Sequence, residues 1–222
     1  VPDIVSEVKT GIGGTYSFEY ENSSRFDNTG GDGIPDLPMN YKVCVKQTAE
    51  DGQGNRVVMK YEYKNGCAFS AFTGGCKETD YFGFGEFKTI DAYGGRTINT
   101  YNAMPYDDFR LNRALAGAIK ESRFVGSDNI EHSRTEYEYT VREIVPPSAP
   151  PLMRAGTETG MATKSFLIEP TAVRTYKEGT LVQTATSTIE LTPGEYEMVS
   201  RTTGTTDHYD DSVHDPVTVS SY

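Results

Sequence analysis

Strict two-residue alternation is the feature that most constrains how this chain can fold. In TYSFEY (15–20), aromatic rings occupy every second position, with polar or charged residues between them. The same pattern carries Tyr61 and Tyr63 in VMKYEYKNG, and Tyr137 and Tyr139 in HSRTEYEYTV. Successive side chains of a β-strand point to opposite faces, whereas a helix repeats every 3.6 residues. The alternation therefore predicts β-strands that carry aromatic rings on one face.

Turn-forming residues separate these runs throughout a chain that contains 22 glycines and 11 prolines. Turns are predicted at 65–66, 93–95, 126–129 and 177–179. Each YxY pair is predicted to end its strand beside a glycine or asparagine turn, and the unit recurs without a fixed repeat length. Because a single hairpin cannot bury a face alone, the hairpins are expected to stack side by side. The predicted fold class is all-β and mostly antiparallel.

One segment departs from the strand pattern. In MPYDDFRLNRALAGAI, Leu111, Leu115 and Ile119 recur at helical spacing, which predicts a short helix over 105–116 that ends near Gly117. A strand is the alternative interpretation of this segment.

A proline-rich stretch, VPPSAPPLMRAG, cannot hold a sheet ladder, because proline lacks a backbone donor and fixes its φ angle. It predicts an exposed loop at 146–156. The chain is thus divided into a β segment over 1–145, this loop, and further β-hairpins over 157–222. Val1 begins inside strand-like sequence, so we expect a piece of a longer polypeptide.

The charge excludes two classes of partner. The formal net charge of −11 opposes nucleic-acid backbones and anionic membrane surfaces, because like charges repel. No apolar run approaches the roughly 18 residues of a membrane-spanning helix, so direct membrane insertion is not expected. Tyrosine (15) exceeds phenylalanine (10) and tryptophan is absent, which suits sheet faces with one wet side.

Three cysteines cannot all pair within one chain. Cys67 and Cys76 flank the glycine-rich stretch CAFSAFTGGC and could close it by a disulfide. Three reduced thiols are the alternative. The spacing fits no zinc motif.

The strongest candidate for a metal site is DNTGGDGIPD, in which Asp27, Asp32 and Asp36 could supply oxygen ligands to calcium. Its spacing differs from that of an EF-hand, and an acidic turn between strands is the alternative. No other cofactor is expected. The chain has no GxSxG nucleophile elbow and no cysteine–histidine arrangement, so we expect no enzymatic activity.

Three blocks in order resemble the mid-region of Tc insecticidal toxin B components, which are RHS/YD-repeat proteins. They are GIGGTYSFEYENSS, DLPMNYKVCVKQTAEDGQGNRVVMKYEYKNG and KETDYFGFGEFKTIDAYG. The third contains Gly83, Phe84, Gly85 and Asp91, which match a GFG signature followed by aspartate. The similarity covers roughly residues 5–145, and the cysteine-bracketed stretch departs from the family pattern.

The resemblance implies a structural role rather than catalysis. In that family, hairpins wind into a hollow β-shell that encloses a toxic C-terminal polypeptide, and the shell docks on a pore-forming subunit. It implies secretion, with the rest of the shell and the enclosed cargo as partners. Two alternatives stay open: a secreted carbohydrate-binding or calcium-stabilised β module, favoured by surface tyrosines, and a hydrolase, favoured only by abundant carboxylates.

Overall fold

The structure is a computed structural model of the 222-residue chain. It describes residues 4–29, 37, 39–73, 76–102, 114–144, 165–192, 198–209 and 217–221. Within these strands, side chains are described except at 69–73, 76–82, 143–144, 165–166, 189–192, 198–204, 208 and 217–221.

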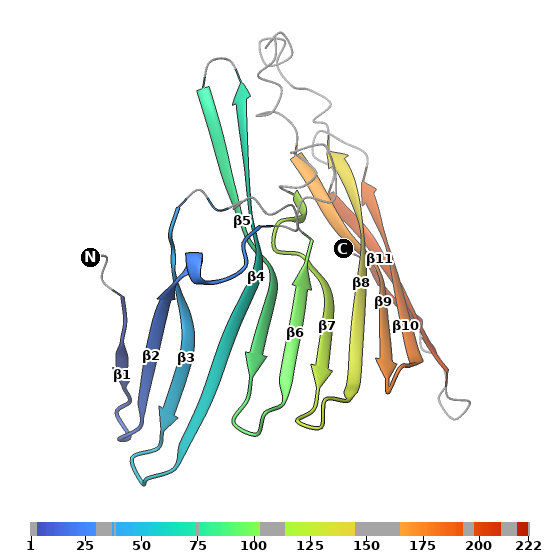
Figure 1. The fold of residues 1–222 in the computed structure, drawn as a ribbon. Coiled ribbons are helices and arrows are strands. Elements are labelled where there is room, and N and C mark those ends of the chain that lie inside the picture. Colours follow the sequence, from blue (N-terminus) through green and yellow to red (C-terminus); the bar gives the residue numbers. More distant parts are fainter. Residues whose placement is uncertain are drawn as a thin grey trace.

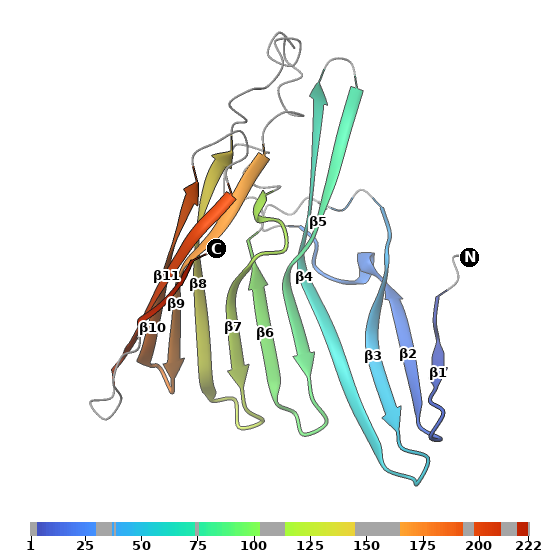
Figure 2. The same cartoon turned by 180° about the vertical axis from the view of Figure 1, so that it is seen from behind.

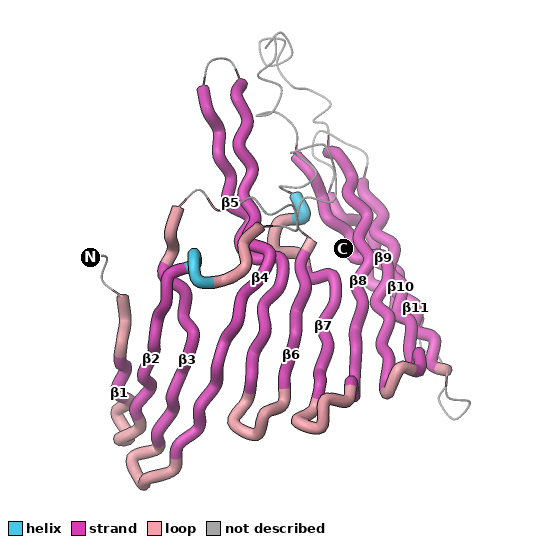
Figure 3. The backbone as a smooth tube through the Cα atoms, viewed as in Figure 1, coloured by secondary structure: helices cyan, strands magenta, loops and turns pink. Residues whose placement is uncertain are grey.

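Twelve strands form one sheet in which each strand pairs with its neighbours in sequence (Figures 1 and 3). Every pairing is antiparallel, which confirms the predicted fold class. The strands are β1 (Glu7–Lys9), β2 (Thr15–Asn22), β3 (Lys42–Glu50), β4 (Arg56–Thr73), β5 (Cys76–Ile90), β6 (Arg96–Tyr101), β7 (Ile119–Val125), β8 (Glu131–Ile144), β9 (Ser165–Lys177), β10 (Thr180–Thr192), β11 (Met198–His208) and β12 (Val217–Ser221). A short 3-10 helix, η1 (Ser23–Arg25), follows β2.

The sheet runs without interruption across the predicted proline-rich boundary. Strand β8 pairs with β9 from Ser133↔Lys177 to Ile144↔Ser165. The predicted segments 1–145 and 157–222 therefore contribute to one sheet, while the loop at 146–156 lies outside the described residues. The hairpins predicted over 157–222 are present as the β9–β10 and β11–β12 pairs.

The helix predicted over 105–116 lies largely outside the described residues. Ala114 and Leu115 are helical, and the amide of Ala118 donates to the carbonyl of Leu115 at 2.9 Å. Gly117 has a φ of 80°, a left-handed conformation that commonly ends a helix. The predicted end near Gly117 is confirmed, and the body of the helix stays a prediction.

The short turns that join β1 to β2, β3 to β4, β5 to β6, β7 to β8 and β9 to β10 lie side by side at the same ends of the strands (Figure 1). Four of these turns have five residues: Thr10–Gly14, Asp51–Asn55, Asp91–Gly95 and Gly126–Ile130. The fourth residue of each is left-handed: Gly13 at 91°, Gly54 at 97°, Gly94 at 87° and Asn129 at 65°. Glycine and asparagine tolerate this conformation, which is why they recur at the same turn position. The predicted turns at 93–95, 126–129 and 177–179 are confirmed.

Side-chain oxygens close several of these turns. Asp91 Oδ1 accepts hydrogen bonds from the amides of Tyr93 and Gly95, both at 2.8 Å. Asp51 plays the same part in the preceding five-residue turn, and Thr10 Oγ1 accepts from the amide of Gly14 at 2.9 Å. Thr10, Asp51 and Asp91 open turns that lie 41 and 40 residues apart, a regularity that the irregular strand lengths conceal in the sequence.

The turn predicted at Asn65–Gly66 is wrong, because β4 continues through both residues as far as Thr73. Asn65 adopts a φ of 53° within the strand. At Gly66, an added Cβ would lie 2.7 Å from Leu37 Cγ and 2.9 Å from Asn28 Cβ. The glycine is therefore needed because the β2–β3 connection crosses the strand here, and not because the chain reverses.

The YxY pairs accordingly lie inside strands and not at their ends. Tyr61 and Tyr63 are internal to β4, and Tyr137 and Tyr139 are internal to β8. Beyond the main sheet, β4 and β5 continue as a two-stranded ribbon as far as Thr73↔Cys76 (Figure 1).

The described residues bury very little apolar surface. Among them, the buried hydrophobic residues are Cys67, Leu115 and Ala172. A sheet normally buries one face against a second layer. The described sheet stands as a single curved layer (Figures 1 and 2), and both of its faces are largely open.

We predict that Gly66→Ala lowers the free energy of unfolding by about 1–3 kcal/mol, because the new methyl group overlaps Leu37 and Asn28. Urea denaturation followed by circular dichroism measures this change. Gly11→Ala is the matched control, because its Cβ would meet nothing within 4 Å. Equal stability of the two variants would contradict the described crossing.

We also predict a loss of stability at acid pH that depends on two turn carboxylates. The Asn55 side chain, together with backbone amides, lowers the pKa of Asp51 below its ordinary value of 3.8. The amide of Ile130, followed by the charge of His132, lowers the pKa of Asp128. A carboxyl group whose pKa is lower in the folded than in the unfolded chain stabilises the fold at pH values above its unfolded-state pKa. This contribution is lost as the pH falls through the folded-state pKa of the group.

The melting temperature should therefore fall between about pH 5 and pH 3. The double variant Asp51→Asn with Asp128→Asn should lose less over this range, because an amide oxygen still accepts hydrogen bonds but does not titrate. Identical pH profiles for the variant and the unmodified chain would refute this role.

Candidate functional site

The two faces of the sheet carry different chemistry, as the strand register shows. From Tyr63, one line of paired residues runs across the sheet through Phe87, Asn99, Ser122, Thr135 and Thr175. The neighbouring line runs from Lys64 through Glu86, Thr100, Glu121, Glu136 and Arg174. Adjacent lines point to opposite faces.

We call the first side the aromatic face. It carries Tyr16, Phe18, Tyr20, Tyr61, Tyr63, Phe87, Phe124, Tyr137 and Tyr139. The opposite side is the charged face. It carries Glu19, Lys46, Glu62, Lys88, Glu121, Arg123, Arg134, Glu136, Glu138 and Arg174. In the sequence EYEY of β8, the two glutamates lie on the charged face and the two tyrosines on the aromatic face.

Tyr63 is the centre of the aromatic face. Its ring centroid lies 5.3 Å from that of Phe26, 4.9 Å from Phe84 and 5.2 Å from Phe87. Its hydroxyl donates to the carbonyl of Cys44 at 2.6 Å. Such tilted and edge-on contacts at 4.5–7 Å are the arrangement that aromatic rings prefer. Four segments of the chain thus meet at one ring.

Tyr61 extends this cluster along β4. It stacks on Phe87 with centroids 5.7 Å apart, and its hydroxyl donates to Gln47 Oε1 at 2.9 Å. Burial, followed by the nearby Cys44, raises its pKa. Burial likewise raises the pKa of Tyr139, which lies near Tyr137 on β8. The four tyrosines of the predicted motif therefore share one face but form two separate pairs.

The charged face neutralises itself through ion pairs between neighbouring strands. Lys46 pairs with Glu19 at 2.5 Å, and Lys88 with Glu62 at 2.5 Å. In both pairs the glutamate is exposed and the lysine is half-buried, so water screens the interaction and each pair stabilises the fold by no more than about 1 kcal/mol. This side is suited to contact with water.

Like charges stand directly opposite each other at β7 and β8, where Glu121 faces Glu136 and Arg123 faces Arg134. Ion pairs along each strand compensate, because Arg123 contacts Glu121 within β7 at 2.8 Å and Arg134 contacts Glu136 within β8 at 3.3 Å. The Arg134 guanidinium also lies 4.4 Å above the ring of Tyr176.

The GFG block serves to bend β5. Gly83 has a φ of 85° and stands opposite Cys67, where the register shifts by one residue. Gly85 is buried, and Phe84 reaches the ring of Tyr63. Asp91 is not part of this bend, since it closes the β5–β6 turn.

The strand register does not bring together the two cysteines of the predicted disulfide. Cys67 pairs with Gly83, whereas Cys76 pairs with Thr73 at the end of the ribbon. Residues six positions apart on a strand are separated by about 20 Å, and a disulfide requires Cα atoms within about 7 Å. This pairing is incompatible with the predicted bridge.

The calcium prediction falls mostly on residues outside the described chain, because Asp32 and Asp36 are not described. Asp27 is exposed, and its Oδ1 accepts a hydrogen bond from the Thr29 hydroxyl at 2.8 Å, which lowers the pKa of Asp27. Within the described ranges, no group of three or more histidine, cysteine, aspartate or glutamate side chains could hold a metal ion. Calcium binding at this loop stays a prediction.

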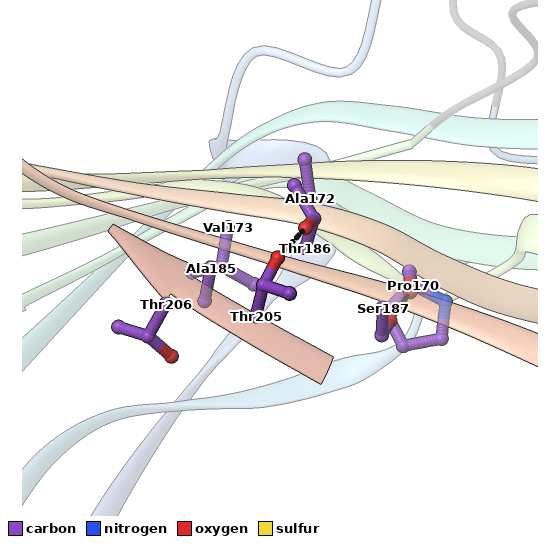
Figure 4. A pocket seen from close by; sticks show the side chains of 8 residues that line it. All are labelled: Pro170, Ala172, Val173, Ala185, Thr186, Ser187, Thr205 and Thr206. Atoms are coloured by element: carbon purple, nitrogen blue, oxygen red, sulfur yellow. Dashed lines mark hydrogen bonds between the residues drawn. The ribbon is translucent and has the colours of Figure 1, made fainter. Parts of the chain in front are cut away.

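A shallow hollow of about 290 Å³ lies across β9, β10 and β11 (Figure 4). Small side chains line it: Pro170, Ala172, Val173, Ala185, Thr186, Ser187, Thr205 and Thr206. The Thr186 and Thr205 hydroxyls share a hydrogen bond of 2.6 Å. None of the described residues that line this hollow is ionisable.

Sequence reasoning missed two members of the aromatic cluster. Phe87 follows from alternation once β5 is in register with β4, so its signal was present in GFGEF. Phe26 lies in the connection after η1, where no periodic pattern marks it. Only the chain crossing brings Phe26 to Tyr63.

Comparison with known proteins shows which family part of the chain resembles. Residues 2–108, which include β1–β6, match the family described as the insecticide toxin TcdB middle/N-terminal region. This match spans slightly less than half of the chain. No curated protein matches the sequence. Tyr61, Tyr63 and the GFG block lie within the matched residues.

A solved structure described as the crystal structure of TcdB2-TccC3-Cdc42 contains the same fold over most of the chain. The TM-score is 0.60 at 15% sequence identity, with 92% of this chain and 15% of that chain covered. At this identity the likeness concerns the fold alone. The chain therefore corresponds to a small part of a much longer one. In the described residues, no helix is both long and apolar enough to cross a membrane.

We predict that Tyr63→Phe lowers the free energy of unfolding by about 0.5–1.5 kcal/mol, because the bond to the Cys44 carbonyl is lost while the ring contacts remain. Thermal and urea unfolding both measure the change. Tyr137→Phe is the control, because its hydroxyl makes no hydrogen bond within the described chain. A similar loss in both variants would argue against the Cys44 bond.

Proposed function

We propose that this chain is a structural segment of the β-shell of a secreted, Tc-type RHS/YD-repeat toxin. The shell encloses a toxic C-terminal polypeptide and helps to deliver it. The observation that carries the proposal is the single-layer sheet. In the described residues, almost none of the side chains on its aromatic face are buried in a core.

A single-layer sheet is the architecture that the wall of a larger shell needs. A closed globular domain packs two layers around one core. In a shell, a layer one strand thick can be curved around a volume and continued by further hairpins at its edge strands. Strands β1 and β12 are the outer members of the described sheet, and pairing there would remove exposed edges.

The proposed role is non-catalytic. The glutamates named on the charged face pair with lysine or arginine side chains, and Asp51 and Asp91 in the turns bind backbone amides. These contacts hold the strands and turns in position, which is typical of a structural role and not of catalysis. The proposed partners are the rest of the shell, the enclosed polypeptide and a pore-forming toxin subunit.

Protease protection in the parent polypeptide tests the proposal. The C-terminal polypeptide should resist proteinase K in the native protein and become sensitive after Ile98→Pro. Ile98 lies in β6 between Lys88 and Arg123, so a proline there removes a ladder donor in the middle of the sheet.

Ala92→Pro is the matched control, because Ala92 occupies a turn position that accepts proline. Electron microscopy of the native protein should show a hollow particle. Rapid digestion of the C-terminal polypeptide in the native protein, or a solid particle, would overturn the shell assignment.

A further inference from the structure

The aromatic face contains a hollow that the ring cluster leaves open. Its volume is about 270 Å³, and it is lined by Tyr63, Phe84, Phe87, Tyr101 and Gly117. Strands β4, β5 and β6 supply the four rings, and Gly117 lies where the chain enters β7. None of the described residues that line it is charged.

The hollow has the size and chemistry for an aromatic ring. An apolar cavity of about 150 Å³ is enough to hold benzene in a protein interior. A further aromatic ring bound in the hollow would be stabilised by the same edge-on and tilted contacts that the cluster already uses. Tyr101 also offers a hydroxyl, so a ligand with a polar tip is tolerated.

The chain itself shows how such a ring is presented. Phe26 belongs to a non-sheet connection, yet its ring lies edge-on to Tyr63 with centroids 5.3 Å apart. The next residue, Asp27, forms an isolated parallel bridge with Lys64 at the edge of β4. An extended peptide thus reaches the same central ring and offers it a phenylalanine.

We propose that the hollow bounded by Tyr63, Phe84, Phe87 and Tyr101 is a docking site for an aromatic side chain on an extended segment of another polypeptide. The inner contact is the same Tyr63 ring that receives Phe26, so the site continues an interface that the chain already uses. This binding is separate from the shell role, and the 222-residue chain alone should show it.

The absence of tryptophan from the chain gives a clean probe. A peptide of sequence Gly-Ser-Thr-Trp-Thr-Ser-Gly can be excited selectively, and docking of its indole should shift the emission to shorter wavelength. A peptide with phenylalanine in place of tryptophan should compete, and one with alanine should not. No shift at any soluble peptide concentration overturns the proposal.

Tyr101→Ser should weaken binding at least fivefold, because it removes one wall of the hollow. Tyr93→Ser is the matched control, since Tyr93 lies in a turn and is 90% exposed. Equal weakening by both substitutions would overturn the site.

A second measurement does not depend on the folding of any variant. With benzoylphenylalanine in place of the peptide's tryptophan, photo-crosslinks should map by mass spectrometry to the residues that line the hollow. Crosslinks centred on Phe124, an exposed ring elsewhere on the aromatic face, would instead show non-specific adsorption and refute the assignment.

Discussion

Backbone hydrogen bonding between neighbouring strands is the interaction on which the rest of this structure depends. In a two-layer protein, burial of a shared core would fix the strands even if some ladders were weak. Here the described sheet has one layer, and the long pairing of β4 with β5 and of β8 with β9 positions every side chain. The ring cluster at Tyr63 and the ion pairs of the charged face are consequences of that register.

The division into an aromatic and a charged face follows from a two-residue period that persists through bulges. At Glu19/Tyr20 the register shifts, yet Phe18 and Tyr20 stay on the same side because the extra residue belongs to β3. The charged side can remain in water, since its ions find partners along and between the strands. The aromatic rings form no such ion pairs, and they are stabilised most when another surface covers them and removes them from water.

Much of this architecture could be predicted from local patterns, because alternation and turn chemistry act over a few residues. The strands around Tyr61 and Tyr137, and the turns at Gly94 and Gly179, follow from such patterns. The errors arise where distant segments meet. Gly66 resembles a turn glycine, but the crossing of Leu37 explains it, and the Cys67–Cys76 spacing carries no information about the β4–β5 register.

The row of five-residue turns also governs where this protein can change length during evolution. Neighbouring turns touch, because a Cβ at Gly52 would lie 2.6 Å from the Gly13 carbonyl and one at Gly94 would lie 3.4 Å from Ser127 Cβ. An insertion in one turn would displace the next, so this edge tolerates few additions. At the other ends of the strands, the cysteine-bracketed ribbon of β4 and β5 extends beyond the main sheet without contacting this row of turns. Lineage-specific additions should therefore accumulate on one margin of the sheet and leave the strand register intact.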